Sequence, residues 1–250
     1  MTTPHTLSDF DFALPPELIA QHPAAERSAS RLLDGTGAAP VDRVFRELPS
    51  LLNPGDLLVF NDTRVIKARL LGVKTTGGQV EALVERVLPG YEVLMHLRAS
   101  KSPKRGQRVR FGLSVEAAMA AGTDSGFDAE VLGRAGPEDS LFHLRFPSDP
   151  QTLLDRYGHV PLPPYITHAD DADDERRYQT VFAVKPGAVA APTAALHFDQ
   201  ALLGALTGRG IEQARVTLHV GGRTVRAARK SRSSPRHLPR FYTSETPASA

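Results

Sequence analysis

Cysteine is absent from the 250-residue sequence. This absence excludes disulfides, thiolate zinc sites, iron–sulfur clusters and a cysteine nucleophile. No stretch approaches the ~20 consecutive apolar residues of a membrane span. The first ten residues have neither the basic start nor the apolar run of a secretory signal. We therefore expect a soluble, cytoplasmic protein that is not bound to a membrane.

An excess of charge of either sign is also lacking. Lys and Arg number 30 against 28 Asp and Glu, a formal net charge of +2, so the chain as a whole is not a polycation. The pI near 9.0 is at most a modest hint of an anionic partner. His and carboxylate residues do not occur at the usual spacings of metal ligands, so no metal is expected. The length fits one or two domains at ~150 residues each.

The stretch from Gly187 to Phe198 is rich in alanine and contains few bulky side chains. Pro192 suits the first turn of a helix, and in such a helix Thr193 and His197, four residues apart, would share one face. Backbone amides at a helix start, a hydroxyl and an imidazole together indicate a ligand site. A tight packing loop between a helix and a sheet explains the small residues equally well, and both interpretations stay open.

A second candidate site follows the apolar run Leu57–Phe60, which is typical of a strand covered on both faces. Asn61, Asp62, Thr63 and Arg64 come directly after it, where ligands bind in α/β sheets. An Asx turn is the simpler alternative. We favour a functional site because Asp62 and Arg64 supply complementary charges that a turn does not need.

The hydrophobic period changes to two between residues 70 and 146. Residues 80–87 and 91–97 read as a hairpin, and further short strands follow at 109–111, 127–132 and 141–146. This spacing predicts a small antiparallel β-barrel inserted into an α/β domain. The domains expected are 1–70 with 147–221, the insert 71–146, and a basic tail 222–250. A helix is expected near 151–157, and a buried strand at 211–220.

These pieces, in this order, resemble the S-adenosylmethionine:tRNA ribosyltransferase-isomerase family of queuosine biosynthesis. The resemblance covers the chain from about Phe10 to Gly221. The matching segments are residues 10–21, 30–33, 55–65, 158–166, 177–181, 190–198 and 216–221. The resemblance implies a barrel-like α/β domain with an inserted small β-barrel.

The resemblance also implies an activity. Such an enzyme moves the ribosyl unit of S-adenosylmethionine onto the 7-aminomethyl-7-deazaguanine wobble base of tRNA and isomerises it, giving epoxyqueuosine-tRNA, adenine and methionine. S-adenosylmethionine is then a consumed substrate, and no recycled cofactor is expected. The partners are S-adenosylmethionine and the anticodon of tRNA, and we expect a monomer.

Roles within that reaction are hypotheses from residue type. Asp62 is expected to act as a base or to bind a ribose hydroxyl, and His197 or His219 to move a proton near neutral pH. The remaining substrate-binding candidates are Arg31, Asn61, Thr63, Arg64, Tyr165, Pro192, Thr193, Ala194 and Thr217. Among them, Arg31 and Arg64 suit a methionine carboxylate or a phosphate, and Thr193 with the amides near Ala194 suits adenine or the carboxylate.

Two departures from the family pattern matter. Ala195 stands where the family usually has glycine before Leu-His-Phe. After Gly221 the sequence is rich in Arg, Ser and Pro and does not follow the family's continuation, so we expect residues 222–250 to be disordered and the chain to be a shortened member. Two hypotheses therefore stand: an active transferase, or an inactive member that acts at most as an RNA-binding remnant through its basic tail and the basic loop around Gly106.

Overall fold

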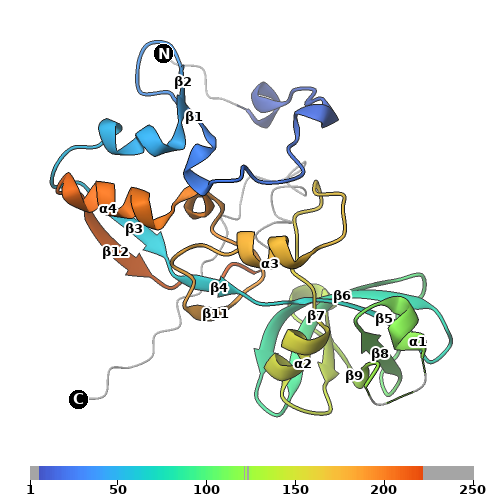
Figure 1. Cartoon of the computed structure of the whole chain (residues 1–250). Coiled ribbons are helices and arrows are strands. Elements are labelled where there is room, and N and C mark those ends of the chain that lie inside the picture. The colour runs from blue at the N-terminus through green and yellow to red at the C-terminus, as the bar shows by residue number, and fades with distance from the viewer. Residues whose placement is uncertain (1–5, 121, 123, 222–250) are drawn as a thin grey trace, which may run out of the picture.

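The computed structural model describes residues 6–120, 122 and 124–221. Figure 1 shows an α/β part beside a β-barrel, with the barrel drawn from cyan to yellow. The expected disordered tail, 222–250, lies outside the described residues. Among the residues described, no helix has both the length and the apolar character needed to cross a membrane.

The barrel is closed, with the strand order β10-β7-β6-β5-β8-β9 and antiparallel pairing throughout. Its strands are β5 (Arg69–Lys74), β6 (Gln79–Leu88), β7 (Glu92–Ala99), β8 (Arg108–Gly112), β9 (Phe127–Ala135) and β10 (Leu141–Arg145). The short helix α1 (Val115–Met119) and the 3-10 turn η5 (Pro137–Asp139) lie in its connections. The predicted inserted barrel and its hairpin are confirmed, while the exact domain boundaries stay a prediction.

Side chains along the barrel strands alternate between the interior of the barrel and its outside. On β6, Val80, Ala82 and Val84 are buried, while Glu81 and Leu83 between them are only partly buried. Phe111, Phe127 and Phe146 fill one end of the interior, with ring centroids 4.9–6.4 Å apart. A period of two in the sequence therefore predicted the other barrel strands, but no strand was predicted at β5.

The α/β part consists of short elements. Its strands are β1 (Arg31–Asp34), β2 (Val41–Val44), β3 (Leu57–Asn61), β4 (Thr63–Val65), β11 (Lys185–Ala188) and β12 (Glu212–Val216). Its α-helices are α2 (Pro150–Tyr157), α3 (Ala172–Arg177) and α4 (Gln200–Gly208), and its 3-10 helices are η1 (Leu7–Phe10), η2 (Pro16–Leu18), η3 (Arg27–Ala29), η4 (Phe45–Leu51) and η6 (Thr193–His197). β1 and β2 form an antiparallel hairpin, whereas β3 pairs with β12 and β4 with β11 in parallel.

Two predictions about strand burial were wrong. Leu57 and Val59 on β3 are 54% and 56% exposed, although the apolar run predicted cover on both faces. Most of β12 is exposed as well, with Ile211 buried just before it. The reason is that β3 and β12 form a sheet of only two strands, and the described residues cover only the face that carries Phe60.

Aromatic rings fill the core beneath that face. Phe60 stacks on Phe182 with ring centroids 4.0 Å apart, and Phe198 meets Phe60 and Phe45 edge-on at 4.9 and 5.0 Å. Leu202 and Leu206 of α4 close this cluster. Figure 1 shows α4 lying beside β3 and β12. The cluster therefore holds the end of β3, where the candidate site begins, against η6 and α4.

Two chain segments connect the parts, and they touch where they cross. Arg69 at the start of β5 exchanges backbone hydrogen bonds with His159, at 3.2 and 2.8 Å. Gly158 lies so close to the outgoing segment that a Cβ there would stand 2.1 Å from the Lys67 carbonyl oxygen. Leu153, Leu154 and Tyr157 of α2 then pack into the barrel core. The crossing fixes the barrel against the α/β part.

We predict that Leu154→Ala destabilises the protein by about 2–5 kcal/mol, because Leu154 is fully buried and its loss leaves a cavity under α2. Arg156→Ala on the same helix is the matched control, since that side chain is 57% exposed and its interactions are a surface ion pair with Asp124 and a contact with the Tyr157 ring. Urea unfolding followed by circular dichroism measures both variants. Equal unfolding free energies for the two would contradict the assigned packing of α2.

Candidate functional site

Polar residues gather at the carboxyl ends of the paired strands β3 and β12. Asn61, Asp62 and Thr63 lie at the β3–β4 junction, and Thr217 and His219 follow β12. The parallel register places Asn61 opposite Val216, and the Asp62 amide donates to the Val216 carbonyl at 2.9 Å. Residues 155 apart in sequence therefore meet at one edge of the sheet, as predicted for ligand sites in α/β proteins.

The Asn61 side chain extends the strand pairing beyond the end of β12. Its Nδ2 donates to the Leu218 carbonyl at 2.8 Å, and its Oδ1 accepts from the Leu218 amide at 3.0 Å. The same Oδ1 accepts from the Thr63 amide at 3.1 Å. Asn61 thus substitutes for a backbone partner and fixes the residue before His219.

Asp62 carries the carboxylate of this cluster. The Thr217 hydroxyl donates to its Oδ1 at 2.6 Å. The Asp62 backbone carbonyl accepts from the amides of Val184 and Lys185, at 2.8 and 3.1 Å, which holds the turn that begins β11. The half-buried carboxylate is consequently fixed in place at the carboxyl end of β3, with Oδ1 already bound to a hydroxyl.

His219 is held between Thr63 and Gly187. Its Nδ1 lies 2.8 Å from the Thr63 hydroxyl, which is almost fully buried and also reaches the Lys185 carbonyl at 3.4 Å. Gly187 has a φ of +142°, and a Cβ on it would stand 2.9 Å from the imidazole ring. Only glycine accommodates both this backbone and the ring. When the Thr63 hydroxyl donates to Lys185, Nδ1–H of His219 donates to Thr63 and Nε2 carries the lone pair; when the hydroxyl donates to Nδ1, Nε2 carries the proton.

His197 belongs to a second polar group. Ser30 donates its hydroxyl proton to the Arg27 carbonyl at 2.8 Å, so His197 Nδ1–H donates to Ser30 Oγ at 2.7 Å, and Nε2 is the basic nitrogen. Phe45 packs against the ring with centroids 5.2 Å apart. The neutral imidazole is thereby held in one tautomer.

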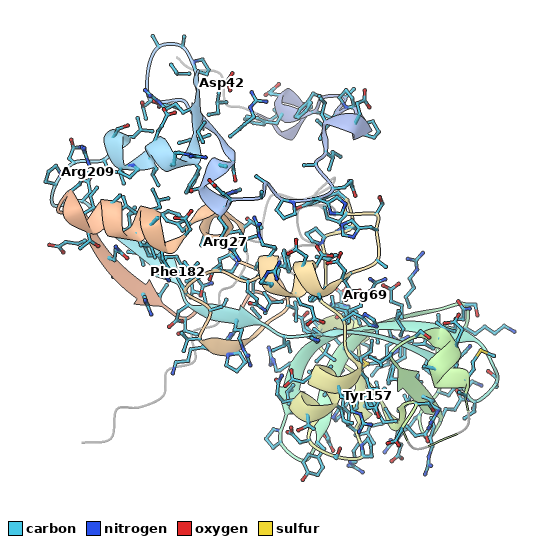
Figure 2. The ribbon with its side chains drawn as sticks, in the orientation of Figure 1. Arg27, Asp42, Arg69, Tyr157, Phe182 and Arg209 are labelled. Carbon is cyan, nitrogen blue, oxygen red and sulfur yellow. The ribbon has the colours of Figure 1, made fainter. Side chains whose placement is uncertain are left out.

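Burial lowers the pKa of His197, and the nearby Arg27 guanidinium lowers it further. Arg27 donates to the carbonyls of Leu196, Arg177 and Arg176 at 3.0, 3.3 and 3.1 Å. Figure 2 shows Arg27 in the interior of the α/β part, between α4 and α3. His197 therefore stays neutral at pH 7 and can accept a proton, but it does so weakly.

The expected face shared by Thr193 and His197 is not formed. A helix does begin after Pro192, but η6 is a 3-10 helix of five residues. With three residues per turn, positions four apart point about 120° away from each other. Thr193 and Ala194 are exposed, whereas His197 turns inward toward Ser30.

Three other candidates lie apart from both polar groups. Arg31 on β1 forms an exposed ion pair with Asp42 at 2.9 Å. The Tyr165 carbonyl accepts from Gln21 at 3.0 Å, and its side chain is half exposed. Arg64 follows Thr63 on β4, so its side chain points to the opposite face from Thr63, where it lines a separate pocket.

Sequence reasoning did not connect Ser30, Arg27 or Gly187 with the two histidines. Ser30 and Arg27 lie about 170 residues before His197, and no periodicity connects them to it. Gly187 was noticed only as a small residue. The sequence signal that could have identified it is the glycine itself, because a residue without a side chain lets a bulky ring lie against the backbone.

The two groups combine a carboxylate, two imidazoles with free Nε2 positions and three hydroxyls. Such groups can remove or deliver a proton and orient a polar substrate. Among the described residues, no cluster of three or more His, Asp or Glu is arranged to hold a metal ion. The chemistry that this arrangement supports is proton transfer between oriented organic groups.

Known proteins resemble the chain over most of its length. S-adenosylmethionine:tRNA ribosyltransferase-isomerases from Herminiimonas arsenicoxydans and Azoarcus sp. (strain BH72) are 55% and 56% identical to it over 225 and 226 residues. The matches cover 90% of this chain and 62% and 61% of those proteins, so the chain spans about three fifths of the length of these relatives.

A solved structure, of the S-adenosylmethionine tRNA ribosyltransferase from Thermotoga maritima, is 30% identical. The match covers 85% of this chain and 58% of that one, with a TM-score of 0.32. The model of the queuosine biosynthesis protein family matches residues 7–243, which include both polar groups. The chain therefore belongs to the queuosine biosynthesis protein family.

Proposed function

We propose that this chain transfers and isomerises the ribosyl moiety of S-adenosylmethionine onto the 7-aminomethyl-7-deazaguanine wobble base of tRNA. The products are epoxyqueuosine-tRNA, adenine and methionine. S-adenosylmethionine is a consumed donor in this reaction, and the protein acts as a monomer in the cytoplasm. The names of the relatives support the transferase over the RNA-binding alternative.

The observation that carries the proposal is the meeting of Asp62, Thr63, Thr217 and His219 within a family match that spans most of the chain. The reaction needs a base for the proton on the carbon beside the sulfonium, since the positive sulfur makes that proton acidic. It also needs a proton for the departing adenine. The carboxylate can take the proton from carbon, and an imidazole that accepts a proton at Nε2 can pass it on to the departing adenine.

We assign the proton removal to Asp62 and the proton transfer to His219, which Thr63 and Gly187 hold in position. Asn61 positions both through the backbone of Leu218. His197, near the end of the Gly187–Phe198 stretch, is the second proton carrier. Arg31, Tyr165, Pro192, Thr193 and Ala194 remain proposed substrate contacts that bind once tRNA or S-adenosylmethionine is present.

We predict that the purified 250-residue chain releases adenine from S-adenosylmethionine only when tRNA with the precursor base is present. Chromatography of the free base measures the release. The controls omit tRNA or replace it with tRNA that carries guanine at the wobble position. No release from a protein that unfolds cooperatively would contradict the proposed activity for this chain.

We predict that Asp62→Asn lowers kcat by about a hundredfold or more, because an amide cannot take a proton although it still accepts from Thr217. Asp128→Asn is the matched control, since Asp128 on β9 of the barrel forms a surface ion pair with Arg110. Single-turnover adenine release measures both. A rate for Asp62→Asn within a few fold of the control would remove Asp62 from the mechanism.

We predict that His197 produces an acid limb in the pH dependence of kcat/KM, located below the ordinary histidine pKa of about 6.5 because burial and Arg27 lower the pKa of His197. At pH values above that limb the ring is neutral and active. Protonation at lower pH occupies the Nε2 lone pair, so the ring can no longer accept a proton. The free energy of unfolding also decreases as the pH is lowered below about 6.5, because the unfolded state binds this proton more readily than the folded state. His197→Gln should abolish the limb, and an unchanged limb would assign it to another group.

A further inference from the structure

A pocket of about 110 Å³ lies where the segment from β4 to the barrel passes between α2 and α3. The Thr63–His219 pair does not use it, because Arg64 points to the opposite face of β4 from Thr63. Figure 2 shows this seam above the barrel, in the neighbourhood of Arg69 and α3. Seams between two parts of a protein are common positions for ligand sites.

The floor of the pocket is apolar and rigid. Val65, Ile66 and Val160 line it, and all three are buried. Gln179 pairs with Val65 from the side, accepting from its amide at 3.0 Å and donating to its carbonyl at 2.7 Å. The wall on that side is therefore fixed before any ligand binds.

The rim carries charges of both signs. Arg64 lies at one wall, and in the part of the chain that the structure describes no carboxylate pairs with it. Asp155 and Glu175 line the same pocket from α2 and α3. Glu175 is occupied by Lys67 at 2.5 Å, whereas Asp155 accepts only a neutral amide, from Gln151 at 3.0 Å. Arg64 and Asp155 are thus the cation and the anion available to a ligand.

We propose that this pocket binds an α-amino acid with a short apolar side chain, the carboxylate on Arg64, the ammonium on Asp155 and the side chain on the apolar floor. This ligand is the methionine end of S-adenosylmethionine, an identification that rests on the proposed function. The binding contacts are charge-assisted hydrogen bonds, which are shorter and stronger than neutral ones.

Other ligand classes fit less well. A nucleotide needs a larger cavity, since drug-sized ligands occupy about 300–1,000 Å³. A phosphate would face the carboxylates of Asp155 and Glu175, and like charges at close range are strongly unfavourable. A neutral ligand would strip water from Arg64 and Asp155 without replacing their hydrogen bonds. A small zwitterion satisfies both charges at once.

The test is calorimetric titration of the full chain with L-methionine, in the absence of tRNA. We expect binding that weakens at least about tenfold in Arg64→Gln and in Asp155→Asn. Arg209→Gln is the matched control, because Arg209 is an exposed arginine beyond the far end of α4, as Figure 2 shows. L-methioninamide lacks the carboxylate and 3-(methylthio)propionate lacks the ammonium, so each should bind more weakly than methionine.

The proposal is overturned if the folded wild-type chain does not bind methionine, or if Arg64→Gln binds it as well as Arg209→Gln does. Both arginine variants change exposed side chains, and a cooperative thermal transition verifies that each is folded. Adenine release separates this inference from the proposed function. If Arg64→Gln turns over S-adenosylmethionine with an unchanged KM, the proposed pocket is refuted and the proposed activity is not. If methionine binding depends on Arg64 but the wild-type chain shows no turnover, the proposed activity is refuted and the pocket is not.

Discussion

The parallel register of β3 with β12 is the constraint on which the candidate site depends. It aligns the carboxyl ends of two strands that are far apart in sequence, and the Asn61 amide continues the pairing to Leu218 where the backbone ladder has ended. A shift of one residue would turn Thr63 and His219 to opposite faces. The polar cluster is therefore a consequence of strand pairing, and its side chains need few contacts of their own to stay in position.

The second constraint is the crossing between the two parts of the molecule. Gly158 allows the returning segment to lie directly on Lys67, and the hydrogen bonds between Arg69 and His159 hold the two segments together. Because α2 is anchored in the barrel core and β4 in the α/β part, this crossing also sets the width of the pocket between them. Arg64 from β4 and Asp155 from α2 line the same pocket at this crossing, where a zwitterion would meet both charges.

Much of this fold could be predicted from the sequence, because alternation identifies strands of a small barrel without knowledge of their partners. Burial could not be predicted equally well: the apolar run at Leu57 and Val59 describes the strand, but not how many elements cover it. The spacing of Thr193 and His197 was similarly ambiguous, since it indicates a common face only in an α-helix and η6 is a 3-10 helix. Contacts such as Ser30 with His197 depend on tertiary packing, and no local pattern carries them.

The two histidines lie in different surroundings, which position the ring of His219 and disfavour the charged form of His197. His219 lies against Gly187, where the missing side chain leaves space for the ring, and a single hydroxyl orients it. His197 is packed against Phe45 and lies near the cation of Arg27, so its charged form is disfavoured twice. Because protonation is disfavoured, the ring stays neutral to a lower pH than an ordinary histidine, and it is also a weaker base. The two environments therefore differ in a defined way: Gly187 and one hydroxyl position His219, whereas burial and a neighbouring cation keep His197 neutral.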